Sequence, residues 1–248
     1  MTRRAEPALL PSAPAELNWQ PIRPKNAATL VLVDRSGTSP RVLMGRRHAN
    51  HRFLPGKYVF PGGRVDPADS RITPAADLAP DTANRLLKGM RGGARPSMAR
   101  ALALAAIRET YEEAGLLIGR GVEAPPRSRS PSWRRFFAHR VVPALDRIAF
   151  VARAITPPRR PRRFDTRFFV ADADAVASDA GRVETPADEL LELNWLTFEE
   201  ARATDIPNIT RFVLGEIERR LNDGDLAALG RPVPFFYMRG RQFMREDL

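Results

Sequence analysis

Apolar residues near the start of the chain follow the short, buried runs that are typical of β-strands. Residues 28–33 and 41–46 form two such runs, and residues 34–40 between them have the polar residues and the glycine that are typical of a turn. This pattern predicts a β-hairpin. Further strands are predicted, in chain order, at residues 58–60, 150–155, 164–171 and 190–196.

Helical spacing of apolar residues is clearest just before Gly115. The apolar stripe there consists of Ala99, Leu102, Ala103, Ala106, Ile107, Tyr111 and Ala114. Other helices are predicted at residues 81–90, 133–148 with a break near Pro143, 198–203 and 209–229. Mixed strands with helices on both faces predict an α/β fold, a three-layer α/β/α sandwich around a mixed sheet.

The striped helix ends in a strongly acidic turn, Arg108-Glu109-Thr110-Tyr111-Glu112-Glu113-Ala114-Gly115-Leu116. Because positions three and four apart are neighbours on a helix, Glu109, Glu112 and Glu113 share one flank. Gly115 can take the left-handed conformation that closes a helix. Clustered carboxylates suit hard cations such as Mg²⁺, which take oxygen ligands. The alternative is a solvated helix face on which Arg108 pairs with Glu112.

This acidic turn resembles the second half of the Nudix box, whose family pattern is G-x5-E-x7-R-E-U-x-E-E-x-G-U with U aliphatic. A counterpart of the first half begins at Gly63, and the sixth residue after it is Asp69, an aspartate where the family has glutamate. Thirty-eight residues, 70–107, separate Asp69 from Arg108 where the pattern has seven, which implies an insertion of 31 residues. Its prolines and glycines predict loop, interrupted by one short helix at residues 81–90.

The resemblance assigns roles to the residues that match it. It implies that Glu112 and Glu113 are the principal ligands of Mg²⁺, with Mn²⁺ as an alternative, and that Glu109 assists as a ligand or activates water as general base. It implies that Arg108 neutralises and orients the acidic cluster and that Asp69 is a further ligand.

Two more parts of the metal site follow from the resemblance. Gly62 and Gly63 would let the backbone approach the metal, with a carbonyl as a ligand. Nudix enzymes often draw another acidic ligand from a loop, for which Glu184, Asp188 and Glu189 are candidates and Glu189 is preferred. The implied reaction is hydrolysis of the diphosphate linkage in a nucleoside diphosphate derivative, without a covalent intermediate.

Residues 43–66 partly resemble the signature of the coenzyme A pyrophosphatase branch of the family. The matching residues are Leu43, Arg47, Arg52, Gly56, Phe60, Pro61, Gly62, Gly63 and Asp66, whereas Met44, Gly45, His48 and Tyr58 depart from it. The resemblance implies coenzyme A or acyl-coenzyme A as substrate, with Arg47 and Arg52 holding a 3′-phosphate. The alternative is that both arginines are surface residues and Phe60 belongs to the core.

Two other functions stay open at this point. One is a diphosphohydrolase of another substrate, such as NADH or ADP-ribose. The other is a Nudix-fold module that binds a nucleotide or RNA with little or no turnover. Retention of Glu109, Glu112 and Glu113 together favours an enzyme, because a binding module would not need all three.

Composition narrows the cellular setting. The chain has 248 residues and no cysteine, so disulfides and thiolate metal sites are excluded, which favours a reducing compartment. No apolar run approaches transmembrane length, and the N-terminus has no apolar signal region. We therefore expect a cytoplasmic protein that does not associate with membranes.

The layout predicted from this pattern is a proline-rich arm at residues 1–25, a Nudix domain at 26–203 with the insertion at about 70–98, and a C-terminal helix and tail at 204–248. The net charge of +11 comes almost entirely from arginine. No nucleic-acid reader motif accompanies it, which disfavours nucleic acid as a partner. Arginines that line a cleft for a diphosphate are an alternative source of this charge. A homodimer, common in the family, is not readable from these residues.

Overall fold

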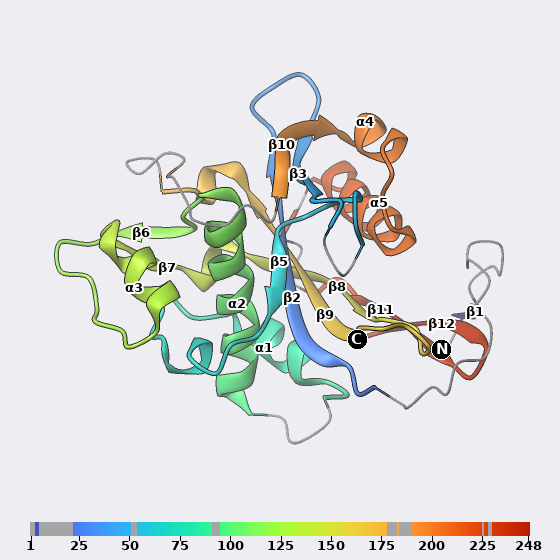
Figure 1. Ribbon diagram of the computed structural model, residues 1–248, viewed down its shortest axis with the longest axis horizontal. Coiled ribbons are helices and arrows are strands. Elements are labelled where there is room, and N and C mark those ends of the chain that lie inside the picture. Colours follow the sequence, from blue (N-terminus) through green and yellow to red (C-terminus); the bar gives the residue numbers. More distant parts are fainter. Residues whose placement is uncertain are drawn as a thin grey trace.

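A computed structural model describes residues 3–4, 22–50, 54–90, 95–177, 183, 190–224, 226–227 and 230–248. Its centre is a mixed sheet with strand order β1-β12-β11-β8-β9-β2-β3-β10 (Figure 1). In chain order these strands are β1 (Arg3–Arg4), β2 (Lys25–Asp34), β3 (Arg41–Arg47), β8 (Ala149–Ile155), β9 (Phe164–Asp172), β10 (Leu190–Thr197), β11 (Pro234–Arg239) and β12 (Gln242–Asp247). Two short strands, β4 (Tyr58–Val59) and β5 (Gly62–Arg64), pair with β3 and β2.

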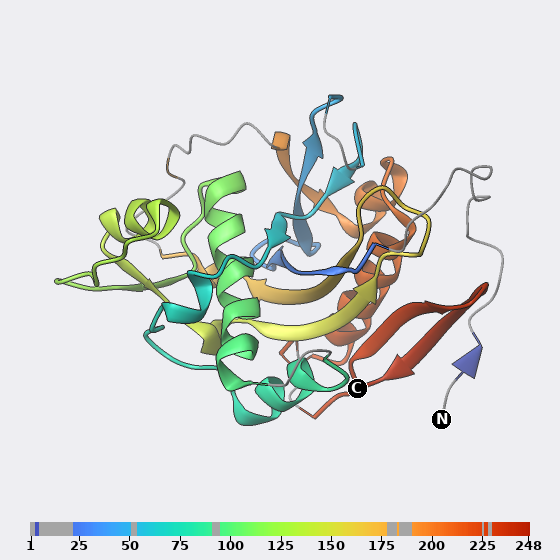
Figure 2. The same cartoon turned by 60° about the horizontal axis from the view of Figure 1, so that its bottom comes forward.

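Helices cover both faces of this sheet (Figures 1 and 2). Helices α1 (Pro80–Leu87) and α2 (Pro96–Ala114) pack on one face, and α4 (Phe198–Ala203) and α5 (Asn208–Asn222) on the other. Successive residues of β2 alternate between the layers: Leu30 and Leu32 face α2, whereas Val31 and Val33 face the α5 side. A strand buried on both faces reads as a continuous apolar run. The predicted α/β sandwich around a mixed sheet is confirmed.

Helix α2 is buried along most of its length and emerges only at its acidic end. From Ala101 to Ile107 every side chain is fully buried, and four of these seven residues are alanines, so the helix can lie close to the sheet. Gly115 ends it at φ 68°, the left-handed conformation that the sequence predicts, and its N–H donates to the Tyr111 carbonyl oxygen at 2.9 Å. None of the helices in the described residues combines the length and hydropathy that a membrane span requires.

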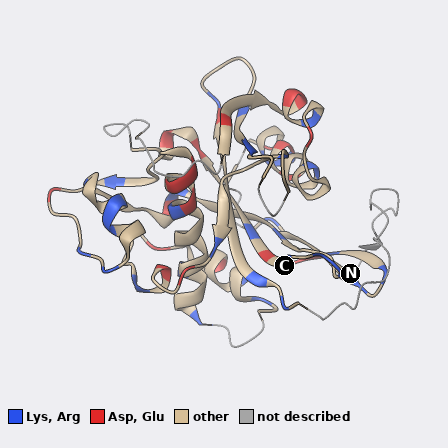
Figure 3. Cartoon of the chain, in the orientation of Figure 1, with Lys and Arg blue, Asp and Glu red and all other residues tan. Residues whose placement is uncertain are grey.

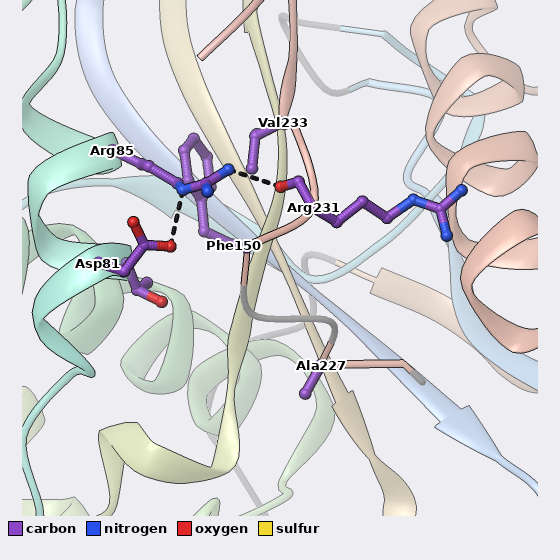
Figure 4. Close-up of a pocket in the computed structure, with 8 residues that line it drawn as sticks. Asp81, Arg85, Phe150, Ala227, Arg231 and Val233 are labelled. Carbon is purple, nitrogen blue, oxygen red and sulfur yellow. Dashed lines mark hydrogen bonds and ion pairs between the residues drawn. The ribbon is translucent and has the colours of Figure 1, made fainter. Parts of the chain in front are cut away.

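The helix of the insertion is docked at the other end of α2, away from the acidic turn. The chain enters the insertion at the 3-10 turn η1 (Asp69–Arg71), and the insertion contains α1, which packs on α2 and β8. Arg85 of α1 pairs with Asp81 and donates to the carbonyl oxygen of Arg231 at 2.6 Å (Figure 4). Arg153 of β8 donates to the carbonyl oxygen of Lys88 at 2.8 Å. The insertion is therefore fixed to the sheet and to the C-terminal segment.

The structure corrects two helix predictions. The helix predicted at residues 133–148 is α3 (Pro131–Ala138), and the chain then enters β7 (Val141–Pro143), which pairs with β6 (Gly119–Gly121). Arg140, at φ 57°, turns the chain out of the helix. The helix predicted to reach residue 229 ends at Asn222, just before Gly224 at φ 78°. In both cases a local backbone reversal ends a helix that apolar spacing alone would continue.

The C-terminal tail forms strands rather than a loop. β11 and β12 make a hairpin, and β11 runs parallel to β8 with Phe235 opposite Arg153. The Arg153 guanidinium lies 4.3 Å from the centre of the Phe235 ring. Strands β11 and β12 thus belong to the same sheet as the preceding strands, and the boundary at residue 203 stays a prediction.

Leu86 tests whether the insertion belongs to the cooperative core. This side chain is fully buried between α1 and α2. We expect Leu86→Ala to lower the free energy of unfolding by about 2–5 kcal/mol because it leaves a cavity. Urea denaturation measures this, with the exposed neighbour Asn84→Ala as a control expected to stay within about 0.5 kcal/mol. Equal stability of both variants would show that the insertion folds apart from the core.

Candidate functional site

Two adjacent glycines bring the start of the box against both the sheet and α2. In β5, Gly62 pairs with Thr29 and Gly63 with Ala28. A Cβ on Gly62 would lie 2.4 Å from the Thr29 hydroxyl oxygen and 2.6 Å from the Ala28 carbonyl oxygen. A Cβ on Gly63 would lie 2.5 Å from the carboxylate carbon of Glu109. Only glycine fits at position 62, because a Cβ would meet backbone atoms of β2, whereas a Cβ at position 63 would displace the Glu109 carboxylate.

Glu113 joins the helix to the glycine turn directly. The residue is only 4% exposed, and its Oε2 accepts a hydrogen bond from the Gly62 N–H at 2.9 Å. A carboxylate that accepts from a backbone N–H in a buried setting holds the two segments in a fixed relation. The two halves of the sequence pattern, 51 residues apart at this contact, therefore meet in space.

Arg108 connects the rest of the site through all of its donors. Nη1 donates to Glu109 at 2.8 Å and to Glu112 at 2.7 Å, and Nη2 donates to the Arg64 carbonyl oxygen at 2.8 Å. Nε and the second Nη2 hydrogen go to Asp69, at 2.9 and 3.2 Å. A guanidinium has five N–H groups, and here each has an acceptor.

The charge of Arg108 is stabilised by these acceptors. Burial alone favours the neutral form, but the hydrogen bonds to Asp69 and the charges of Glu109, Asp69 and Glu112 outweigh it. The pKa of Arg108 is therefore raised above its ordinary value. The side chain stays a cation while only 6% of it is exposed.

Asp69 is fully buried and accepts four hydrogen bonds. Two come from Arg108, one from the Trp133 indole N–H at 2.9 Å, and one from the Asp66 backbone N–H at 2.8 Å. The 3-10 turn η1 brings the backbone close, so the shorter aspartate reaches Arg108. Both oxygens are occupied by these donors, which favours a positioning role. The metal-ligand role of Asp69 stays a prediction.

Helix α3 lies beside the acidic end of α2. Its aromatic face, formed by Trp133, Phe136 and Phe137, is buried, and the Phe136 ring meets Tyr111 edge-on at 5.4 Å between centroids. Arg135, on the other face, places Nη2 3.7 Å from the Glu112 Oε1 atom. Figure 3 shows the acidic end of α2 next to this basic helix. The aromatic spacing of α3 is visible in the sequence, but its position beside α2 is not.

The acidic turn offers oxygen donors that fit a divalent cation by their chemistry. Glu109, Glu112 and Glu113 lie within one turn of a rigid helix, and the glycine backbone at Gly63 touches Glu109. Within the described ranges, no set of three or more His, Cys, Asp or Glu side chains is gathered at metal-binding distance as placed. A cation would share the oxygens of Glu109 and Glu112 with Arg108.

The predicted substrate residues fall into different surroundings. Arg47 ends β3, and its backbone closes the following loop: its N–H donates to the Lys57 carbonyl oxygen, and its carbonyl accepts from Gly56. Phe60 is 4% exposed and packs in the cluster on the α5 side of the sheet. Arg52 and Glu189 lie outside the described residues. Substrate contacts by Arg47 and Phe60 stay predictions.

A charged cluster beside this loop was not evident from sequence. Glu192 lies in a β-bulge of β10 at φ 51°, a strained conformation for a residue with a side chain. Its carboxylate accepts from Arg46 at 2.6 Å and from the Tyr58 hydroxyl at 3.0 Å. Burial and then the hydrogen bond to Glu192 raise the pKa of Tyr58. The cluster joins β3, β4 and β10 at the edge of the sheet.

Comparison with known proteins gives two informative similarities. No family model matches the chain. It is 25% identical over 187 residues to "Putative nudix hydrolase 7" of Caenorhabditis elegans, which covers 71% of this chain and 52% of that protein, so the chain spans about half the length of this curated relative. It also resembles the crystal structure of a NUDIX hydrolase from Alicyclobacillus acidocaldarius, at 25% identity and a TM-score of 0.57, over 81% of this chain and 96% of that one.

The two similarities agree with the internal geometry. The insertion separates the two halves of the family box in the sequence, yet Asp69, Gly62 and Gly63 contact the helix across it. The split box, its closure in the fold and these two similarities agree: the chain is similar to Nudix hydrolases in sequence and in fold.

Proposed function

We propose that this chain is a diphosphohydrolase that uses Mg²⁺, or Mn²⁺, to cleave the diphosphate linkage of a nucleoside diphosphate derivative. The observation that carries the proposal is the contact of Gly62 and Gly63 with Glu113 and Glu109. It brings the glycine turn against two of the helix carboxylates despite the 31-residue insertion. The similarity to Nudix hydrolases supports the same reaction class.

A bound divalent cation would supply electrostatic stabilisation of the diphosphate oxygens and lower the pKa of the attacking water. The chain's own residues would do the rest. Glu112 and Glu113 would hold the cation, and Glu109 would assist as a ligand or accept the proton of the water. Arg108 would keep the carboxylates of Glu109 and Glu112 in one orientation.

The proposed substrate is coenzyme A or acyl-coenzyme A, from the resemblance of residues 43–66. Under this proposal Arg47 and Arg52 hold the 3′-phosphate. A substrate such as NADH or ADP-ribose, or a binding module with little turnover, is the alternative. Glu109 and Glu112, which both accept from Arg108, favour the enzyme, because a module that only binds an anion gains nothing from clustered carboxylates.

Glu113→Gln tests the enzymatic proposal. The change removes a charge and keeps the shape, so turnover should fall by at least about 100-fold if this carboxylate holds the cation. The assay offers coenzyme A, acyl-coenzyme A, NADH, ADP-ribose, dinucleoside polyphosphates and capped RNA with Mg²⁺ or Mn²⁺, and chromatography resolves the products. The control is Glu199→Gln on α4, an exposed glutamate that should keep full activity. Cleavage of no substrate by the unmodified chain, or full activity of Glu113→Gln, contradicts the proposal.

Asp69→Asn separates a positioning role from a ligand role. If Asp69 serves Arg108, its loss leaves a buried cation short of an acceptor, and the metal-free protein should lose about 3–5 kcal/mol of unfolding free energy. A carboxylate that serves mainly as a metal ligand would instead repel its acidic neighbours, so its removal would stabilise the metal-free protein. Denaturation in the presence of a chelator measures whether Asp69→Asn lowers or raises the unfolding free energy. Asp66→Asn, in the same turn but exposed, should stay within about 0.5 kcal/mol.

Arg47→Ala tests the substrate branch. Loss of a charged hydrogen bond to the 3′-phosphate should raise KM for coenzyme A by about 10-fold or more, with little change for dephospho-coenzyme A. Arg52→Ala should behave in the same way. Arg46→Ala is the matched control, because Arg46 is engaged by Glu192. Equal effects of Arg47→Ala on both substrates would argue against recognition of the 3′-phosphate.

A further inference from the structure

Helix α3 presents one arginine to the acidic end of α2. Arg135 reaches within 3.7 Å of Glu112 Oε1, a distance beyond an ordinary hydrogen bond, and its side chain is 47% exposed. Among the described residues Glu112 is its one ion-pair partner. Its neighbour Arg134 is also exposed but has no ion pair within the described part of the chain. Arg135 is therefore a cation at the rim of the site with capacity to bind a further anion.

Arg108 cannot serve this purpose. All five of its N–H groups have acceptors within the fold, and it is buried. A substrate phosphate could bind Arg108 only by displacing Asp69, Glu109, Glu112 or the Arg64 carbonyl. A diphosphate next to the acidic turn needs a second cationic side chain that is accessible from solvent.

The position of Arg135 is fixed by the same carboxylate that fixes Arg108. Asp69 accepts from the Trp133 indole N–H, two residues before Arg135, and both side chains at this contact are fully buried. The Phe136 ring, one residue after Arg135, packs edge-on against Tyr111 of α2. These contacts hold α3 so that its basic face stays beside Glu112. A preorganised guanidinium loses little entropy on binding an anion.

We propose that Arg135 binds a non-bridging oxygen of the substrate's diphosphate. This deepens the proposed function and rests on it. In the free protein the guanidinium is held near Glu112 by a long ion pair; a bound diphosphate offers it closer and more highly charged oxygens in the forked geometry that arginine fits. Arg135 is one of the arginines that give the chain its net charge of +11, and the proposal assigns it a role.

The competing explanation is that Arg135 only screens the charge of Glu112. The two explanations predict different changes in diphosphate binding when Arg135 is removed. Screening opposes a cation at the acidic turn, so loss of Arg135 would tighten cation binding and would leave a diphosphate bound as well as before or better. Phosphate binding predicts weaker diphosphate binding without weaker cation binding.

The test measures binding of α,β-methylene-ADP, a diphosphate whose bridging carbon resists hydrolysis, by isothermal titration calorimetry in the presence of Mn²⁺. Arg135→Ala should weaken binding of this probe by about 10- to 100-fold, the loss of a charge-assisted hydrogen bond. Arg135→Lys should recover part of the affinity, because it keeps the charge but not the fork. Arg134→Ala, on the same exposed face, should bind the probe like the unmodified chain. Titration with Mn²⁺ alone should show no loss of affinity in any variant.

Several outcomes would overturn the assignment: unchanged or tighter probe binding by Arg135→Ala, an equal loss in Arg134→Ala, or no binding of the probe by the unmodified chain with Mn²⁺. Thermal unfolding of each variant verifies that it is folded. If the unmodified chain binds the probe through Arg135 but cleaves none of the substrates above, the proposed function fails and the role of Arg135 stands.

Discussion

The buried ion pair between Arg108 and Asp69 is the interaction on which the site depends. An arginine removed from water is costly unless every donor has an acceptor, and here the acceptors come from η1, β5 and the last turns of α2 itself. Satisfying one side chain therefore requires three segments of backbone to assume their places together. Asp69 also accepts a hydrogen bond from Trp133, so α3 must take its place as well. The acidic turn is ordered because this cation at its base is fully bonded.

The insertion is compatible with this arrangement because the residues on either side of it are held at the site. Asp69 is anchored before the insertion begins, and α2 reaches the site only after about two turns of fully buried helix. Closure entropy grows slowly with loop length, so 31 more residues cost little once both ends are held. The added helix α1 packs near the start of α2, where Arg85 and Arg153 bind it to the C-terminal segment and the sheet.

The two ends of α2 consequently differ in role. Its first turns are part of the core and bear the insertion, whereas its last turn presents carboxylates between the glycine turn and α3. At that last turn, the negative charge of Glu112 faces the positive charge of Arg135 on α3. At the far edge, the strained Glu192 joins β3, β4 and β10 next to the loop that follows Arg47. The candidate site is bounded by elements that lie far apart in the sequence.

The sequence by itself determined the elements whose signal is local. Apolar runs marked β2, β3, β8, β9 and β10, the helical stripe marked α2, and Gly115 marked its end, because burial periodicity and a left-handed cap are properties of adjacent residues. The resemblance carried by Gly63, Asp69 and Arg108 also identified two distant segments as halves of one pattern.

Only the tertiary structure decided what those segments do once they meet. Asp69 bonds Arg108 and Trp133, Arg135 arrives beside Glu112, and residues 234–247 complete the sheet as a hairpin. Strand β7, predicted as helix, exists because β6 is there to pair with it. Each of these contacts depends on partners tens of residues away. A buried charge or an unpaired strand is stabilised by groups that are distant in the sequence, and a local sequence pattern does not identify those groups.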